Sequence, residues 1–296
     1  MGGTMNLRHW LLAFAVCAGL SAGASAEGGR TEVGATACAG CHAEKVEAYK
    51  KSPHGRALGA AKGVPFEKSC ETCHGPGSAH AEGGDVKAIL NPAKSKEGAA
   101  ACATCHAGER GRMFWNGSVH EKNGCSSCHA VHGGTKKLLV KGTQLETCTS
   151  CHGDVKASLM KRSTHPLRDS MRKGGEGKMS CSGCHNPHGS QAEKLMVSRS
   201  VNDTCYTCHA EKKTPMLWEH GPVKEDCLTC HGPHGTSNDK LLTTRPPRLC
   251  QSCHMQGRHQ SGTLGANSVY AVGKACLNCH PMIHGSNHPS GTVLQR

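Results

Sequence analysis

The sequence predicts a chain of mostly irregular coil with short α-helices and little or no β-sheet, wrapped around something other than its own side chains. Only 3% of its 296 residues are aromatic and the mean hydropathy is −0.48, too little apolar volume for an ordinary core. Glycine (38) and proline (13) interrupt nearly every segment, and no alternation typical of a strand appears. The 21 cysteines and 22 histidines, through their spacing, indicate what fills the interior.

The first residues predict export. A positively charged start precedes the apolar run Trp10–Leu20, and small residues follow as far as Ala26. This is the pattern of a signal peptide, residues 1–26, and the run is too short to span a bilayer. A lipid anchor on Cys17 is the alternative, although no small residue stands directly before it. We expect residues 27–296 to form an exported periplasmic protein.

The motif Cys-x-x-Cys-His occurs ten times. Two thiols three positions apart can form thioethers with the two vinyl groups of one porphyrin, and the histidine that follows then points its imidazole at the iron. The motif is therefore typical of c-type haem attachment. The predicted attachment residues are Cys38, Cys41, Cys70, Cys73, Cys102, Cys105, Cys125, Cys128, Cys148, Cys151, Cys181, Cys184, Cys205, Cys208, Cys227, Cys230, Cys250, Cys253, Cys276 and Cys279. The predicted proximal iron ligands are His42, His74, His106, His129, His152, His185, His209, His231, His254 and His280.

Zinc ribbons and disulfides are the alternative uses of paired cysteines. All ten pairs are followed by histidine, although composition alone puts histidine at a given position only about 7% of the time. Every cysteine after Cys17 belongs to a motif, so none remains for a disulfide framework. We therefore expect ten covalently attached haems c.

A six-coordinate haem iron needs a second axial ligand. After His9 and the proximal histidines are set aside, eleven histidines remain, and ten of them keep a regular register with the motifs. The predicted distal ligands are His54, His80, His120, His132, His165, His188, His220, His234, His259 and His284. His288 has no counterpart in the register and is the spare. The alternatives are surface histidines and methionine ligands, but the methionines follow no such register.

The register divides residues 27–296 into five dihaem modules, at about 38–80, 102–132, 148–188, 205–234 and 250–284. Each module contains a motif, an intervening histidine, a second motif and then a tail histidine. His132-Gly133, His188-Gly189 and His234-Gly235 place the tail histidine three residues past a proximal one. So short a connection should not reach the opposite face of the same haem, so we predict that the tail histidine ligates a neighbouring haem. The glycine is expected to permit a tight turn that brings backbone close to the ring.

Short helices are expected at Ala43–Lys50, at Val155–Lys161 and just before several motifs. The porphyrin faces should serve as the apolar core, so the haem-free chain is expected to be largely unfolded, as in metal-dependent domains.

The formal charge of +13 could indicate nucleic-acid binding. Ten haems would add about twenty ionised propionates, which bring the exported protein to about +2 with ferric irons and about −8 with ferrous irons. The basic side chains are better interpreted as propionate partners, so no nucleic-acid partner is expected.

Two segments after motifs read Asn186-Pro187-His188-Gly189 and Gly232-Pro233-His234-Gly235, and the closing segment runs from Cys276 to Ser286 through Ile283-His284-Gly285. With the ten motifs and the leader, the chain resembles the MtrA/DmsE-type decahaem cytochromes over essentially its whole exported length. The resemblance implies bis-histidine haems in an extended wire. It also implies a periplasmic cytochrome inserted in an outer-membrane β-barrel porin, with other cytochromes as electron donor and acceptor. Membrane association would then occur only through the partner.

The predicted function is electron transfer, not enzymatic catalysis. Ten linked one-electron centres suit transport over distance, since no single catalytic step needs ten. Under the resemblance, the path carries respiratory electrons across the outer membrane to an extracellular acceptor such as a metal oxide or DMSO, or runs inward from iron oxidation. The alternatives are a soluble periplasmic shuttle that feeds a terminal reductase, a multihaem reductase, and a haem filament.

Overall fold

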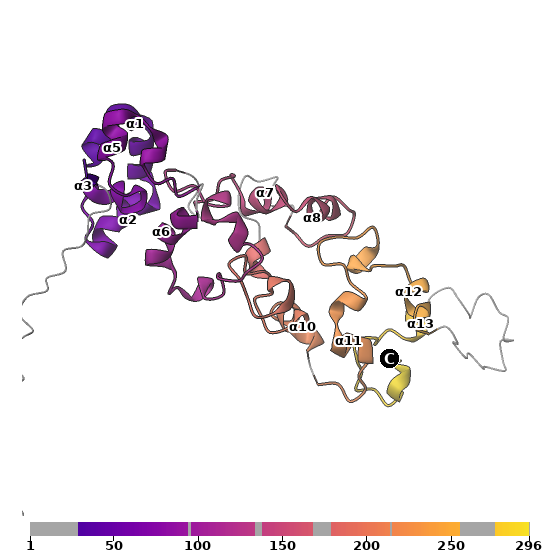
Figure 1. Ribbon diagram of the computed structural model, residues 1–296. Helices are drawn as coiled ribbons and strands as arrows, with labels where there is room; N and C mark the ends of the chain where they lie inside the picture. The colour runs from indigo at the N-terminus through magenta and orange to yellow at the C-terminus, as the bar shows by residue number, and fades with distance from the viewer. Residues whose placement is uncertain are drawn as a thin grey trace, which may run out of the picture.

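The computed structural model describes residues 29–93, 96–133, 138–167, 179–213, 215–254 and 276–295. The predicted leader and His259 lie outside the described residues. The described chain forms an elongated body, with the N-terminal helices gathered at one end and the C-terminal segments at the other (Figure 1).

The α-helices are short. The N-terminal group comprises α1 (Ala35–Lys51), α2 (Pro53–Lys62), α3 (Phe66–Ser69), α4 (Glu71–His74) and α5 (Ser78–Gly83). Along the body follow α6 (Lys96–His106), α7 (Gln144–Thr149), α8 (Gly153–Ser158), α10 (Val201–Tyr206), α11 (Gly221–Glu225), α12 (Arg248–Gln251) and α13 (Cys276–Cys279). The 3₁₀ turns are η2 (Val86–Ala88), η3 (Arg110–Arg112), η4 (Glu121–Asn123), η5 (Cys125–Ser127), η6 (Cys181–Gly183), η7 (Glu193–Leu195), η8 (Ala210–Lys212), η9 (Cys227–Thr229), η10 (Asp239–Leu241) and η11 (Gly291–Val293).

The predicted fold class is confirmed. Within the described ranges, β structure is limited to isolated bridges such as His185 with Met196 and His231 with Leu242. The helix expected at 43–50 lies inside α1, and the helix expected at 155–161 is α8, which ends earlier, at Ser158. As expected, α6, α7, α10 and α12 run into motifs.

Local signals set the helix starts. At α7, the Thr143 hydroxyl accepts a hydrogen bond from the Glu146 N–H while the Glu146 carboxylate accepts from the Thr143 N–H, a complete capping box. Ser200 caps α10 through the Asp203 N–H in the same way. These caps set the first residue of each helix and so the position of the motif at its C-terminal end.

Few hydrophobic side chains are buried. Among the described residues they are Ala35, Val46, Tyr49, Leu139, Leu145, Leu159, Met196 and Leu294. Eight side chains cannot stabilise a chain of this length by apolar burial alone. The interior therefore depends on something that the side chains surround.

A segment that we call the return segment pairs with each later even-numbered motif. The return segments are residues 138–140, 194–197, 240–243 and 293–295. In the second, the Asn186 N–H donates to the Leu195 carbonyl and the Val197 N–H donates to the Cys184 carbonyl. Leu138, Leu195, Leu241 and Leu294 occupy the equivalent position with φ between 54° and 58°, which is costly for a residue with a β-carbon. The repetition of this strained turn indicates a positional requirement, because such strain persists only where its surroundings impose it.

Successive repeats interlock through the turns after the tail histidines. Ser163 and Thr236 exchange backbone hydrogen bonds, and so do Trp218 and Ser286. The glycines after the tail histidines enter the same junctions: Gly189 (φ 109°), Gly235 (φ 146°) and Gly285 (φ 120°). A β-carbon on Gly235 would overlap the Ser158 carbonyl of the preceding repeat. At these three positions the glycine backbone lies close to the chain of the preceding repeat.

Candidate haem centres

Each motif folds into one helical turn. In the sixth motif the His185 N–H donates to the Cys181 carbonyl, 2.9 Å away, and the equivalent bond recurs at His129, His209, His231 and His280. One turn brings residues i, i+3 and i+4 to the same side of the backbone. Both thiols and the imidazole of each motif can therefore meet one macrocycle.

Nine of the ten proximal imidazoles face a predicted distal imidazole. Ring centroids lie between 5.7 and 6.5 Å apart in the pairs His42–His80, His54–His106, His74–His132, His120–His152, His129–His188, His165–His209, His185–His234, His220–His254 and His231–His284.

That separation fits an iron between the two rings. Metal–imidazole bonds are about 2 Å long, and two of them plus about 1.1 Å from each Nε2 to its ring centroid give about 6.2 Å. Direct stacking of two imidazoles would instead bring the rings into van der Waals contact, at about 3.5–4 Å. The residues present therefore fit a bis-histidine haem iron.

The tail histidines face proximal histidines of other motifs. His188, which follows His185 by three residues, lies 6.0 Å from His129. His234, which follows His231, lies 6.0 Å from His185. His132 and His284 are likewise directed two motifs back, to His74 and His231. None of these four rings faces the proximal histidine of its own motif. This is the geometry needed if each tail histidine ligates a neighbouring haem.

The intervening histidines reach in the opposite direction. His54 faces His106, His120 faces His152, His165 faces His209 and His220 faces His254. The second, third and fourth predicted modules thus each direct one imidazole to the next module and one to the preceding module. In the first predicted module, His80 faces His42 of the same module. His80 also differs from the other tail histidines in spacing, because it follows the proximal His74 by six residues.

The other ring nitrogen has a partner in most pairs. Proximal Nδ1 atoms lie 2.6–2.9 Å from backbone carbonyl oxygens in the pairs His74–Leu90, His185–Lys194, His231–Lys240 and His280–Val293. Distal Nδ1 atoms lie 2.8–3.0 Å from carbonyl oxygens in His80–Asp85, His120–Pro187 and His165–Pro233. A carbonyl can only accept, so Nδ1 carries the proton and Nε2 is left for a metal.

His288 behaves differently. Its Nδ1 accepts a hydrogen bond from the Ser290 N–H at 3.1 Å, which places the proton on Nε2. That tautomer has no Nε2 lone pair to offer a metal. The structure thus separates His288 from the paired histidines.

Burial favours the neutral form of several distal imidazoles. Burial first, and the facing imidazole second, lower the pKa of His132, His188 and His234. The same two causes lower the pKa of His54 and His220. The neutral form is the one that coordinates a metal.

Contacts between thiols put the motifs in order. Within each predicted module, burial and the first thiol of the second motif together raise the pKa of the first cysteine of the first motif, which places these two thiols near each other: Cys38–Cys70, Cys102–Cys125, Cys148–Cys181, Cys205–Cys227 and Cys250–Cys276. Burial and the Cys125 thiol raise the pKa of Cys102 to about 11. Between modules, second cysteines lie near cysteines of the next motif, in Cys73–Cys105, Cys128–Cys151, Cys184–Cys208 and Cys230–Cys253. Motifs that are consecutive in sequence are therefore consecutive in space.

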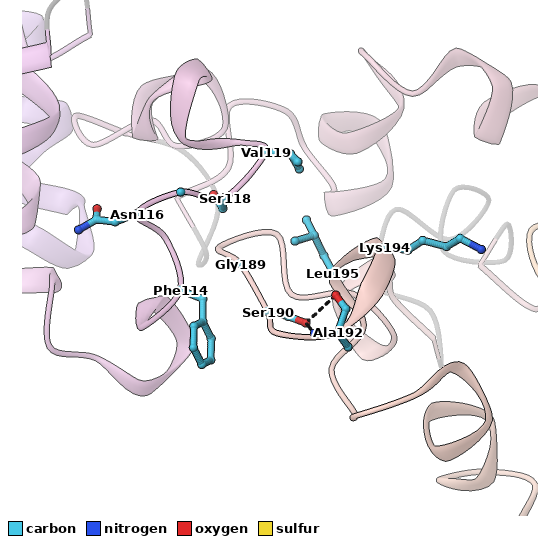
Figure 2. A pocket seen from close by; sticks show the side chains of 10 residues that line it. Phe114, Asn116, Ser118, Val119, Gly189, Ser190, Ala192, Lys194 and Leu195 are labelled. Carbon is cyan, nitrogen blue, oxygen red and sulfur yellow. Dashed lines mark hydrogen bonds between the residues drawn. The ribbon is translucent and has the colours of Figure 1, made fainter.

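A cavity of about 380 Å³ lies at one of the junctions. Figure 2 shows the loop of residues 114–119 opposite the turn of residues 189–195, with the cavity between them. Its lining includes no paired histidine. The cavity belongs to the interlock between two repeats.

Sequence reasoning missed the return segments. Their signal is the recurrence of Lys137-Leu138-Leu139-Val140, Lys194-Leu195-Met196-Val197 and Lys240-Leu241-Leu242-Thr243 about ten residues after an even-numbered motif. It also missed Glu109, whose carboxylate lies 2.7 Å from the Nδ1 of His106.

Repeated motif turns and facing imidazoles, with few buried apolar side chains in the described ranges, define a multihaem cytochrome c. A family model for the doubled CXXCH motif matches residues 117–157, 174–214 and 220–259. Each matched doublet begins with the second motif of one predicted module and ends with the first motif of the next. The Multiheme cytochrome MtrA of Shewanella baltica (strain OS185) is 46% identical over 288 residues, covering 92% of this chain and 84% of that protein.

The chain belongs to the MtrA family of multihaem cytochromes, which carry covalently bound haem c and transfer electrons. Among the residues that the structure describes, none of the helices has the length and apolar character needed to cross a bilayer.

Proposed function

We propose that this protein is a periplasmic decahaem conduit that carries respiratory electrons across the outer membrane while held in a porin. Bound haem c supplies one-electron chemistry at each centre. The chain's own contribution is to hold the centres in sequence order, and the file of nine facing imidazole pairs along an elongated body is the observation that carries the proposal.

Ten attachment sites and twenty axial histidines are part of this proposal. The nine pairs support bis-histidine ligation at nine centres, and histidine on both faces favours low reduction potentials. For the tenth centre, at His280, the register predicts His259, since every other distal histidine in the register already faces a motif.

The extracellular acceptor is proposed to be a metal oxide or a DMSO-type compound, and the donor another cytochrome. The similarity to MtrA over 92% of the chain supports this assignment. The leader at residues 1–26 supports export to the periplasm. A soluble shuttle to a terminal reductase remains the second candidate, because the same ordered centres would serve it.

Purification from detergent-solubilised outer membranes tests the proposal. An affinity-tagged chain should retain a β-barrel porin in stoichiometric amount, identified by mass spectrometry, and intact-mass analysis of the chain should show ten added haems. A tagged, unrelated periplasmic cytochrome from the same cells is the control. Recovery of the decahaem chain in the soluble periplasmic fraction, with no porin bound, would favour the shuttle.

Function is then tested with the chain and its porin in liposomes that enclose a reduced dye. A conduit should oxidise the enclosed dye when a ferric compound is added outside, and porin without the cytochrome should not. Equal rates in the two preparations would contradict the conduit.

A further inference from the structure

Proximal histidines differ in what their Nδ1 atom meets. In several even-numbered motifs, the Nδ1 of the proximal histidine lies at hydrogen-bonding distance from a backbone carbonyl. Examples are His185 with Lys194 and His231 with Lys240. In the third motif, Nδ1 of His106 instead faces a carboxylate, Glu109 Oε1, at 2.7 Å. A carboxylate is a charged acceptor, and hydrogen bonds to charged groups are shorter and stronger than neutral ones.

Arg112 completes the arrangement. Its Nη2 pairs with Glu109 Oε2, and its Nε donates to the His106 carbonyl at 3.1 Å. Nη2 also lies 2.8 Å from His106 Nδ1. Once Nε2 binds a metal, Nδ1 carries the proton and must donate, so of these two neighbours only Glu109 can be its partner. The arginine then holds the carboxylate in place.

We propose that Glu109 is a positioning residue that makes the His106 imidazole a stronger ligand and so lowers the reduction potential of the third haem relative to its neighbours. The inference rests on the proposed ligation of that haem by His106 and His54. A carboxylate on the second nitrogen raises the basicity of a ligating imidazole, and a more basic ligand stabilises the ferric state.

The seventh motif offers a weaker version of the same feature. Glu211 Oε1 lies 3.7 Å from Nδ1 of His209, beyond hydrogen-bonding distance. Its effect on ligand strength should therefore be small. Of these two motifs, only the third has the carboxylate within hydrogen-bonding distance.

Ring orientation makes the third haem separable by spectroscopy. The planes of His54 and His106 cross at 87°, and those of His120 and His152 at 82°, whereas the other seven described pairs lie at 46° or less. Low-spin ferric haems with crossed imidazole planes give electron paramagnetic resonance (EPR) signals with a large maximal g value. The third and fifth haems should supply these signals.

Glu109→Gln in the haem-loaded protein tests the proposal, because the amide keeps an acceptor but removes the charge. Glu47→Gln is the matched control. Glu47 also forms an ion pair with a basic residue three positions later, Lys50, but this partner is an ammonium group and not an imidazole. In E109Q, a redox titration followed by EPR should show one crossed-plane signal moving to a higher potential by at least about 59 mV, a tenfold change in a one-electron equilibrium constant. The g values of the same signal should change, because ligand strength changes.

E47Q should alter neither quantity. Unchanged g values and potential in E109Q, or equal shifts in both variants, would overturn the role of Glu109. Absence of crossed-plane low-spin signals from the wild-type protein would instead count against the proposed bis-histidine ligation of the third and fifth haems.

Discussion

At the scale of single residues, a paired histidine can make two different contacts. In His165, Nδ1 donates to the Pro233 carbonyl, and the ring faces the imidazole of His209. The residue that supplies this carbonyl, Pro233, directly precedes a second distal histidine, His234. The ring of His234 faces His185. The ligand sets of nearby centres are thereby joined through one peptide unit.

His188→Ala should open the haem bound at Cys125 and Cys128, and not the haem of its own motif. The reason is that the His188 ring faces His129. About a tenth of the haem should change from low spin to high spin, since one of ten irons loses an axial ligand. EPR measures the fraction, and a structure of the variant locates the open site. A vacancy at the haem bound by Cys181 and Cys184 would contradict the assignment.

His259→Ala and His288→Ala should differ in effect. The register predicts His259 as the distal ligand of the tenth haem, whereas the Nδ1 of His288 accepts a hydrogen bond from the Ser290 N–H. H259A should therefore produce one high-spin haem and H288A none, again by EPR. A high-spin signal in H288A, with none in H259A, would reverse the two roles.

At the scale of elements, the N-terminal segment is held on α4 by one carboxylate. Glu71 is 6% exposed and accepts hydrogen bonds from the N–H groups of Val33, Gly34 and Gly77 at 2.9–3.0 Å. Burial raises the pKa of this carboxyl, but the three donors outweigh burial and lower it overall. Three donors aimed at one carboxylate fix the approach of the chain to α1.

Glu71→Gln should reduce the free energy of unfolding by about 1–3 kcal/mol at pH 7, since an amide leaves part of this donor set without an acceptor. Because the folded-state pKa is depressed, the wild-type contribution is present above the unfolded value of about 4.3 and is lost as pH falls through the folded value. Denaturant unfolding of both proteins from pH 7 to pH 3 should show the difference shrinking. Glu82→Gln, on the exposed side of α5, is the control. A difference that does not vary with pH would contradict the assignment.

One junction between repeats requires glycine, because there is no room for a side chain at this position. Gly235 has φ 146°, and a β-carbon would meet Ser158 and Thr164. Gly235→Ala should destabilise the haem-loaded protein by about 1–3 kcal/mol. Gly221→Ala, at a position with open space and no positive φ, should stay within about 0.5 kcal/mol of the wild type. Thermal unfolding followed at the haem absorption band compares them, and equal midpoints would show that the junction tolerates a side chain.

At the scale of the whole molecule, stability and function have the same source. The described chain buries few apolar side chains, and its repeats are joined by imidazoles that face one another across repeat boundaries. Ligation across those boundaries would bind every repeat to the next. Cofactor should therefore hold together what side-chain packing cannot.

The haem-free chain should lack cooperative structure. Expression without haem attachment, followed by circular dichroism, should give weak helical signal and no sigmoidal melt, while the haem-loaded protein melts cooperatively under the same conditions. A cooperative melt of the haem-free chain would show that the polypeptide alone forms the fold.

Spacing in the sequence determined the chemistry. Cys181-x-x-Cys184-His185 and its nine counterparts predict covalent haem because thioether and iron bonds require fixed local distances, and one helical turn supplies them. The lack of an ordinary core is likewise predicted by composition. The register predicts the distal histidines and the spare His288 by counting, and it led us to predict that tail histidines turn away from their own motif.

Only the tertiary structure decided which histidine faces which. His54 meets His106 across a distance in sequence of 52 residues, and no local spacing encodes that partner. The left-handed turn at Lys194-Leu195, the junction glycines and the carboxylate of Glu109 also became visible only in three dimensions. The physical reason is that covalent attachment depends on one turn of chain, whereas the second axial position would be filled by whichever segment the packing of successive repeats brings to the opposite face.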